Sequence, residues 1–294
     1  LPRLGHDELK ELGMAKMGER MTFMKAVKLS ENVPPTETAQ AKFKAFYQRM
    51  GAAEAIQGLM DTPLSSLRDT MAFITGPGAP SQAALTAGCD EAEAKADQLL
   101  AQGPDEHGLE KDEIAAIHLY TQELMYRVLN RALWSKKRGA VKPYWGYIRL
   151  LQHALFKVPK SEAGTICRGI KEPFHEPVTL DAMLAMATES SPAHPNGGSG
   201  EPIIWWGFSS CSTNQQSAMS FLGHAEQRVL YTIEGGSSAR DVRKYSEFQH
   251  ESEVLMPFGS AFTVVSACNP APLHDPGLLL VTLRQTHNFA LPAQ

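Results

Sequence analysis

Hydrophobic positions recur with helical spacing through the first half of the chain. Within residues 7–29, four methionines three or four positions apart mark one face of a helix, a pattern typical of core packing and less often of a binding groove. Gly- and Pro-rich segments at 76–80 and 103–108 interrupt the pattern. The spacing predicts helices over residues 7–29, 37–59, 90–102, 111–134 and 147–156.

The pattern changes after residue 160 to short apolar or β-branched runs bounded by Gly, Pro or Ser. These runs predict strands at 165–170, 205–210, 228–234, 252–256, 261–267 and 278–284. A Gly- and Ser-rich loop at 190–200 lacks the strand-to-helix context and the Lys-Ser/Thr ending of a phosphate loop. Helices followed by a run of strands predict an α+β fold.

Composition narrows the function classes. The 294 residues are 43% hydrophobic and 20% charged, with a net charge of -4, which is ordinary for a globular protein and argues against a general nucleic-acid binder. No apolar run is long enough to span a membrane. The chain starts without a Met or a signal-peptide pattern, so we expect it to be part of a longer protein.

The four cysteines do not form a C-x-x-C pair, and no His/Cys spacing resembles a zinc site. We therefore expect no metal. Four cysteines in a chain of this length do not make a disulfide scaffold, which favours a reducing, cytoplasmic location; delivery into another cell as an effector is the alternative.

Candidate chemistry centres on Glu251 and Glu253, two residues apart before an apolar run. On one β-strand they would point to the same face, where two like charges repel. A site that handles a developing positive charge would benefit from such a pair. Taken alone, the pair is more often an exposed surface feature.

Two upstream segments strengthen the functional interpretation of the Glu251/Glu253 pair. Arg168 ends a predicted strand and precedes Gly169, which offers a bidentate fork for phosphate beside an approachable backbone. Ser210 lies in the segment 207–214, whose hydroxyls can orient a carboxylate or form a plain turn. Each segment alone has a structural explanation, and no G-x-S-x-G elbow supports a nucleophilic serine.

Together, Arg168, Ser210 and the Glu251/Glu253 pair resemble the R-S-E motif of the arginine-modifying mono-ADP-ribosyltransferases. Residues 113–133, with a Tyr-Thr pair, the approach to the first strand at 155–169 and the S-x-F-x-x-E-x-E-V-L run at 246–255 are also similar to this family. The likeness covers residues 105–290. One departure is Cys211, where the family usually has Thr; we expect its side chain to point away from the site.

The resemblance implies two perpendicular antiparallel sheets around an NAD cleft, preceded by a helical N-terminal region. It divides the chain into a helical region, residues 1–104, and a catalytic domain, residues 105–294. Residues 4–29 resemble the last two helices of a SAM domain whose first half is missing, which suggests self-association; an unrelated helix pair is the alternative.

The family also implies a role for each residue. Glu253 stabilises the positive charge on the ribose as the nicotinamide bond breaks, and Ser210 holds Glu253. Arg168 grips the pyrophosphate, and the backbone of Gly169 takes the nicotinamide amide. NAD is a consumed substrate, and the implied partner is an acceptor protein with an exposed arginine.

Three further residues and the first Glu complete the implied site. Glu251 pairs with the acceptor guanidinium and helps its nitrogen lose a proton. Phe221 flanks the nicotinamide, or packs in the core. Tyr245 and Phe248 contact the acceptor protein, or pack within their turn.

Two other functions stay open at this stage. An NAD glycohydrolase would use the same site with water as acceptor, and retention of Glu251 favours transfer over hydrolysis. A non-catalytic interaction module would keep the fold, but it would not need all four motif residues. His250 and the pair His274-Asp275 have no nucleophile beside them and are expected to be ordinary surface residues.

Overall fold

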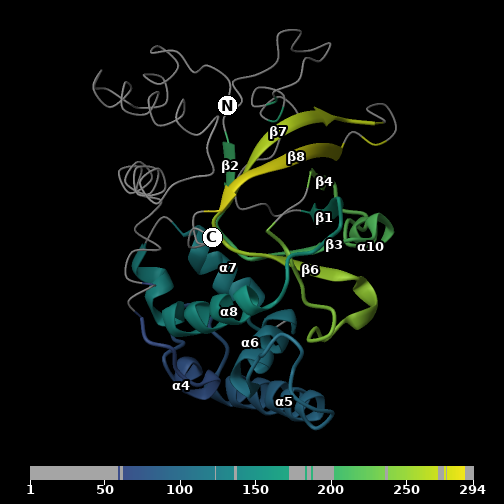
Figure 1. The fold of residues 1–294 in the computed structure, drawn as a ribbon. Helices are drawn as coiled ribbons and strands as arrows, with labels where there is room; N and C mark the ends of the chain where they lie inside the picture. Colours follow the sequence, from purple (N-terminus) through teal and green to yellow (C-terminus); the bar gives the residue numbers. More distant parts are fainter. Residues whose placement is uncertain are drawn as a thin grey trace, which may run out of the picture.

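A computed structural model of the protein describes residues 59, 62–122, 124–135, 138–171, 183, 187, 202–235, 238–270, 275 and 277–288. The helices predicted over 7–29 and 37–59, including the SAM-like segment, lie outside these residues apart from Leu59. Figure 1 shows most of the described helices gathered at one end of the molecule and the strands at the other. No helix in the described ranges has the length and apolar character that a membrane crossing requires.

The residues that precede the first strand in the sequence form the helical lobe. Its elements are α4 (Leu67–Ala72), α5 (Gln82–Leu100), α6 (Lys111–Thr121), α7 (Tyr126–Trp134), the 3-10 turn η2 (Arg138–Tyr144) and α8 (Trp145–Lys157). Local signals set the starts of these helices: the Ser81 hydroxyl accepts from the Ala84 amide to begin α5, and Glu110 and Glu113 form a capping box at α6.

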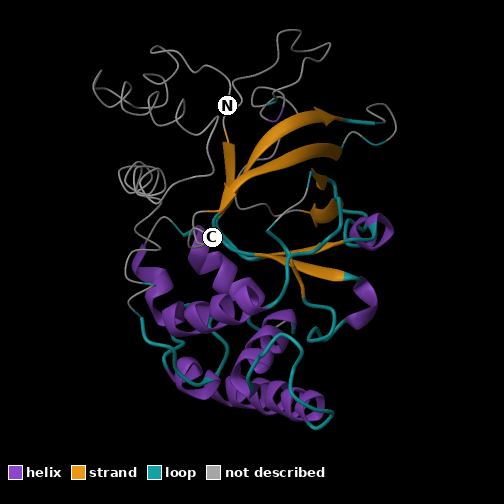
Figure 2. Cartoon of the chain, in the orientation of Figure 1, coloured by secondary structure: helices purple, strands orange, loops and turns teal. Residues whose placement is uncertain are grey.

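The strands that the structure describes form one hydrogen-bonded sheet in the order β2-β7-β8-β4-β1-β3-β6-β5, and among them only the β4–β8 pair is parallel. They are β1 (Thr165–Lys171), β2 (Pro202–Trp205), β3 (Ser209–Ser212), β4 (Arg228–Glu234), β5 (Arg240–Asp241), β6 (Glu253–Met256), β7 (Ser260–Cys268) and β8 (Leu278–Asn288). Two short elements, α10 (Gln215–Ser220) and the 3-10 turn η3 (Gln249–Glu251), lie among them. Figure 2 shows this segregation of helices and strands, so the predicted α+β class is confirmed. In place of the two perpendicular antiparallel sheets that the resemblance implies, the described strands are joined into this one mixed sheet.

Two predicted elements are divided in the structure. The helix predicted over 111–134 breaks after Thr121, because Gln122 takes an extended conformation before α7 begins. The strand predicted over 205–210 breaks between β2 and β3. A Cβ on Gly207 would lie 2.7 Å from the Asn130 side chain, so this break packs against α7.

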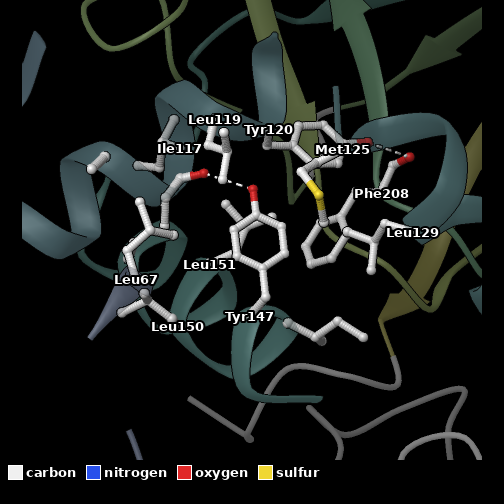
Figure 3. Packing of buried hydrophobic residues seen from close by; sticks show 14 of the residues in the cluster. Leu67, Ile117, Leu119, Tyr120, Met125, Leu129, Tyr147, Leu150, Leu151 and Phe208 are labelled. Atoms are coloured by element: carbon white, nitrogen blue, oxygen red, sulfur yellow. Dashed lines mark hydrogen bonds between the residues drawn. The ribbon is translucent and has the colours of Figure 1, made fainter. Parts of the chain in front are cut away.

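One hydrophobic core fills the helical lobe and extends to the sheet. Leu85 of α5, Ile114 of α6 and Leu151 of α8 belong to the same buried cluster as Phe208, which precedes β3. Described residues on both sides of the predicted boundary at 104 therefore contribute to this core. Figure 3 shows its centre, where the Tyr120 hydroxyl donates to the Phe208 carbonyl at 3.0 Å. This bond fixes the start of β3 against α6.

Candidate active site

Three neighbouring strands bring the motif segments together. β1 pairs with β3 through Cys167 and Ser212, and β3 pairs with β6 through Ser212 and Glu253. The Arg168, Ser210 and Glu253 segments, which are far apart in the sequence, are therefore adjacent in the sheet. Burial raises the pKa of the Cys211 thiol on β3 to about 12. The positive charge of Arg168 lowers this pKa and the negative charge of Glu253 raises it.

Arg168 is held by the backbone of β3. Its Nη1 donates to the Ser210 carbonyl, and its guanidinium carbon lies 5.8 Å from the centre of the Trp205 ring. The side chain is half-buried. A guanidinium has five N–H donors in a planar fork, so a side chain fixed by one of them can present others to an anion.

Gly169 is required by packing. A Cβ at this position would lie 2.1 Å from the Ala218 carbonyl of α10, closer than any side chain tolerates. Because Gly169 has no side chain, the backbone of α10 can pack directly against it. The same short helix ends at Phe221, which is 48% exposed, so a core role for Phe221, the role that the sequence favours, is wrong.

Glu253 is buried and held by a serine from its own loop. Its side chain is 5% exposed, and the Ser246 hydroxyl donates to its Oε2 at 2.6 Å. The sequence prediction assigned this contact to Ser210. In the structure Ser210 is exposed and pairs with Leu255, two residues along β6 from Glu253.

The prediction that Glu251 and Glu253 share one strand face is wrong. Glu251 ends the 3-10 turn η3, and β6 begins only at Glu253. Between them Ser252 takes a left-handed conformation, with φ 50° and ψ 42°. Strand alternation therefore does not relate the two carboxylates, and Glu251 belongs to the loop that precedes β6.

The end of β3 holds the junction between the two glutamates. The Ser212 hydroxyl donates to the Glu251 carbonyl at 2.7 Å, and the Thr213 amide donates to the Ser252 carbonyl at 3.2 Å. These bonds stabilise the backbone around the left-handed residue, a conformation that a non-glycine residue adopts at a cost of about 1–2 kcal/mol. Ser212, the last serine of the segment 207–214, therefore holds the backbone of Glu251.

The loop between β5 and β6 is anchored to the helical lobe. His118 Nδ1 donates to the Tyr245 carbonyl at 2.8 Å, and the Glu247 amide donates to the Thr121 hydroxyl at 2.9 Å. His118 Nε2 also lies 3.1 Å from Glu247 Oε2. We call residues 242–252 the β5–β6 loop.

The predicted acceptor contact of Tyr245 does not agree with its position. Its side chain is 1% exposed, and its hydroxyl donates to Asp105 at 2.9 Å, so Tyr245 anchors the loop. Lys244 Nζ also binds Asp105, at 2.8 Å. Phe248 differs, because its side chain is 36% exposed on the same loop.

The other singled-out residues have structural roles. Cys211 packs in the buried cluster that includes Val254. Asp275 pairs with Arg228. The side chain of His250 lies outside the described residues. Within the part of the chain that the structure describes, no group of three or more His, Cys, Asp or Glu side chains could hold a metal ion.

Sequence reasoning missed four residues that set the geometry of the site: Ser246, Ser212, His118 and Asp105. Ser246 and Ser212 belong to quoted motifs, so their presence in those motifs was the available signal. His118 and Asp105 are distant in sequence from the loop they hold, and no local pattern marks them.

Comparison with known proteins gives the family of this arrangement. The profile of the family described as NAD:arginine ADP-ribosyltransferase matches residues 78–272. A protein of Mycobacterium avium (strain 104) named Mav, a candidate NAD(+)–arginine ADP-ribosyltransferase, is 32% identical over 180 residues. That match covers 58% of this chain and 18% of Mav, so the chain spans about a fifth of this relative's length.

Two solved structures have a similar fold. The type III effector XopAI from Xanthomonas axonopodis pv. citri is 16% identical, with a TM-score of 0.54 over 85% of this chain and 97% of that one. The eucaryotic mono-ADP-ribosyltransferase ART2.2 is 15% identical, with a TM-score of 0.51 over 82% of this chain and 88% of that one. The family match covers most of the described residues and includes the β1, β3 and β6 segments. This chain therefore belongs to the NAD:arginine ADP-ribosyltransferase family.

Proposed function

We propose that this protein cleaves NAD and transfers its ADP-ribose to the guanidinium group of an arginine in an acceptor protein. The observation that carries the proposal is the buried Glu253 carboxylate, which accepts a hydrogen bond from Ser246 at 2.6 Å. Its strand, β6, pairs with the β3 strand of Ser210, and β3 pairs in turn with the β1 strand of Arg168. Membership of the NAD:arginine ADP-ribosyltransferase family supports the same reaction.

The first step is cleavage of the bond between the ribose C1′ and the nicotinamide nitrogen. Nicotinamide leaves with the electron pair, and positive charge develops on the ribose, as in glycoside hydrolysis. A carboxylate already fixed beside this position stabilises the transition state more than the ground state. Glu253 takes this role, since it is the buried carboxylate of the three-strand site.

The pyrophosphate and nicotinamide ends of NAD need their own contacts. Arg168 takes the pyrophosphate, because its guanidinium is fixed by one donor and its fork can bind phosphate oxygens. Phe221 lies exposed at the end of α10, the helix whose Ala218 carbonyl approaches Gly169 of β1, and flanks the nicotinamide ring. The backbone of Gly169 takes the nicotinamide amide.

The second step joins a guanidinium nitrogen of the acceptor to C1′, and that nitrogen loses a proton. Glu251 pairs with the guanidinium and accepts the proton. Its place in the β5–β6 loop, beside the exposed Phe248, suits contact with a protein acceptor. Self-association through residues 4–29 is a separate proposal that rests on the SAM-like sequence alone.

The experiment uses NAD labelled in its ADP-ribose part and agmatine, a free guanidine. The intact protein is expected to release nicotinamide and to label agmatine, and Glu253→Gln is expected to do neither. Glu234→Gln, which removes an exposed charge at the end of β4, is the matched control and should behave as the intact protein. Nicotinamide release without labelled agmatine would assign NAD hydrolysis instead, and an inert protein would leave the interaction module as the better account.

A further inference from the structure

The Ser246 hydroxyl connects the β5–β6 loop to the Glu253 carboxylate. Its side chain is completely buried, and its Oγ both donates to Glu253 Oε2 at 2.6 Å and accepts from the Phe248 amide at 3.1 Å. A hydroxyl has one hydrogen and two lone pairs. Because the Phe248 N–H occupies a lone pair, the single hydrogen is left for the carboxylate, and the orientation of the hydroxyl is determined.

The backbone on both sides of Ser246 is held by α6. The Tyr245 carbonyl accepts from His118 Nδ1, and the Glu247 amide donates to the Thr121 hydroxyl. The Ser246 amide itself donates to the Val242 carbonyl at 2.9 Å. The position of the hydroxyl is therefore set by a helix of the other lobe and does not depend on the loop alone.

We propose that Ser246 is the positioning residue of Glu253, and that α6 sets its place through His118 and Thr121. This inference rests on the proposed function, since it assigns Glu253 the ribose charge. A hydrogen bond donated to an ionised carboxylate is stronger than one between neutral groups, and it fixes the side chain before the reaction begins. Ser210, which the R-S-E motif suggested for this contact, is then left to line the exposed side of the site.

The test compares nicotinamide release by the intact protein, Ser246→Ala and Ser246→Thr at varied NAD concentration. We expect Ser246→Ala to lower kcat about tenfold or more, because a hydrogen bond to a charged group is lost, while the KM for NAD changes less than about twofold. Ser246→Thr keeps the hydroxyl and is expected to recover most of kcat. Loss of stability alone would lower the amount of folded enzyme and with it the apparent kcat at unchanged KM, so kcat is taken per folded molecule, counted by circular dichroism. A role limited to stability would then leave kcat unchanged in Ser246→Ala.

A matched control comes from another buried serine. The Ser260 hydroxyl, at the start of β7, is also completely buried and donates to the Pro257 carbonyl at 2.7 Å. Ser260→Ala removes a comparable buried hydrogen bond without touching Glu253, so its kcat should stay within about twofold of the intact protein. Equal losses of kcat in Ser246→Ala and Ser260→Ala would overturn the proposal.

A second variant keeps the test decisive if Ser246→Ala does not fold. Thr121→Val removes the acceptor for the Glu247 amide and leaves Ser246 in place, so we expect a smaller fall in kcat, about threefold, with KM unchanged. An unchanged kcat in Thr121→Val, or in a folded Ser246→Ala, would contradict the positioning role. Failure of the proposed function is distinct, because the intact protein itself would then release no nicotinamide.

Discussion

Glu251 and Glu253 are separated by one residue, yet they lie in different kinds of structure. Glu253 begins β6, a strand paired on both sides, is 5% exposed and accepts a hydrogen bond from Ser246. Glu251 ends a 3-10 turn in a loop, is half-buried and is held through its backbone carbonyl by Ser212. The fixed carboxylate suits a charge that develops at a defined atom, whereas the loop carboxylate suits an acceptor that must enter and leave.

The largest expected effect is on nicotinamide release, when the charge of the buried Glu253 is removed. Glu253→Gln keeps the size of the side chain and removes its charge, so nicotinamide release should fall about 10²–10³-fold, the effect typical of removing one preorganised transition-state contact. The KM for NAD should change little, because the contact acts mainly in the transition state. A Glu253→Gln enzyme that keeps most of its kcat would show that another group stabilises the ribose.

The next largest effect is on stability, when Asp105, which holds the β5–β6 loop, is replaced. Asp105 has a side chain that is only 1% exposed. Burial tends to raise the pKa of its carboxyl, but donors from Lys244, the His107 amide and Tyr245 outweigh this, and the pKa lies below its ordinary value. Asp105→Asn should therefore lower the free energy of unfolding by about 2 kcal/mol near neutral pH.

The pH dependence of this loss has a definite sign. A lowered carboxyl pKa adds stability that is present above the unfolded value of about 4 and is lost as the pH falls through the folded value. Urea unfolding at pH 7 and pH 3 should show the difference between the protein and Asp105→Asn shrinking at pH 3. Asp90→Asn, at an exposed carboxylate on α5, is the control and should change stability little at pH 7. A difference that is constant with pH would contradict the ionised state of Asp105.

A smaller effect is expected at the residue that separates the two regions. Ser252 is the one non-glycine residue with positive φ among those described. A β-branched residue tolerates this conformation poorly, so Ser252→Val should destabilise the protein by about 1–3 kcal/mol and reduce labelling of agmatine. Ser252→Gly should stay within about 1 kcal/mol of the intact protein. Equal stabilities for the two variants, measured by urea unfolding, would show that the conformation at 252 is not required.

How far the sequence predicts this molecule depends on the range of the interactions involved. The strands over 165–170 and 228–234 were predicted well, because their runs of apolar and β-branched residues are local signals. The Glu251/Glu253 region was not, because E-x-E followed by apolar residues has the same alternation whether or not the first Glu is in the strand. What removes Glu251 from the strand is the left-handed Ser252, stabilised by bonds from β3.

The residues of the candidate site show the same limit. Motif resemblance predicts Arg168, Ser210 and Glu253 as site residues, and the fold places their segments on three consecutive strands, β1, β3 and β6. The contact to the Glu253 carboxylate was assigned to the wrong serine, since Ser246 reaches it only after the loop is anchored to α6 by contacts about 125 residues apart in sequence. Thr121 belongs to the Tyr-Thr pair noted in the sequence, but nothing local indicates which segment it contacts.

The measurement that tests the division between the two glutamates most directly is the ratio of labelled agmatine to released nicotinamide in Glu251→Gln. If Glu251 serves only the acceptor, this ratio should fall about 10²-fold, the effect typical of losing a general base, while nicotinamide release stays within about threefold of the intact protein. If nicotinamide release falls in parallel with transfer, or the ratio does not change, the two carboxylates do not have separate roles and the account is wrong.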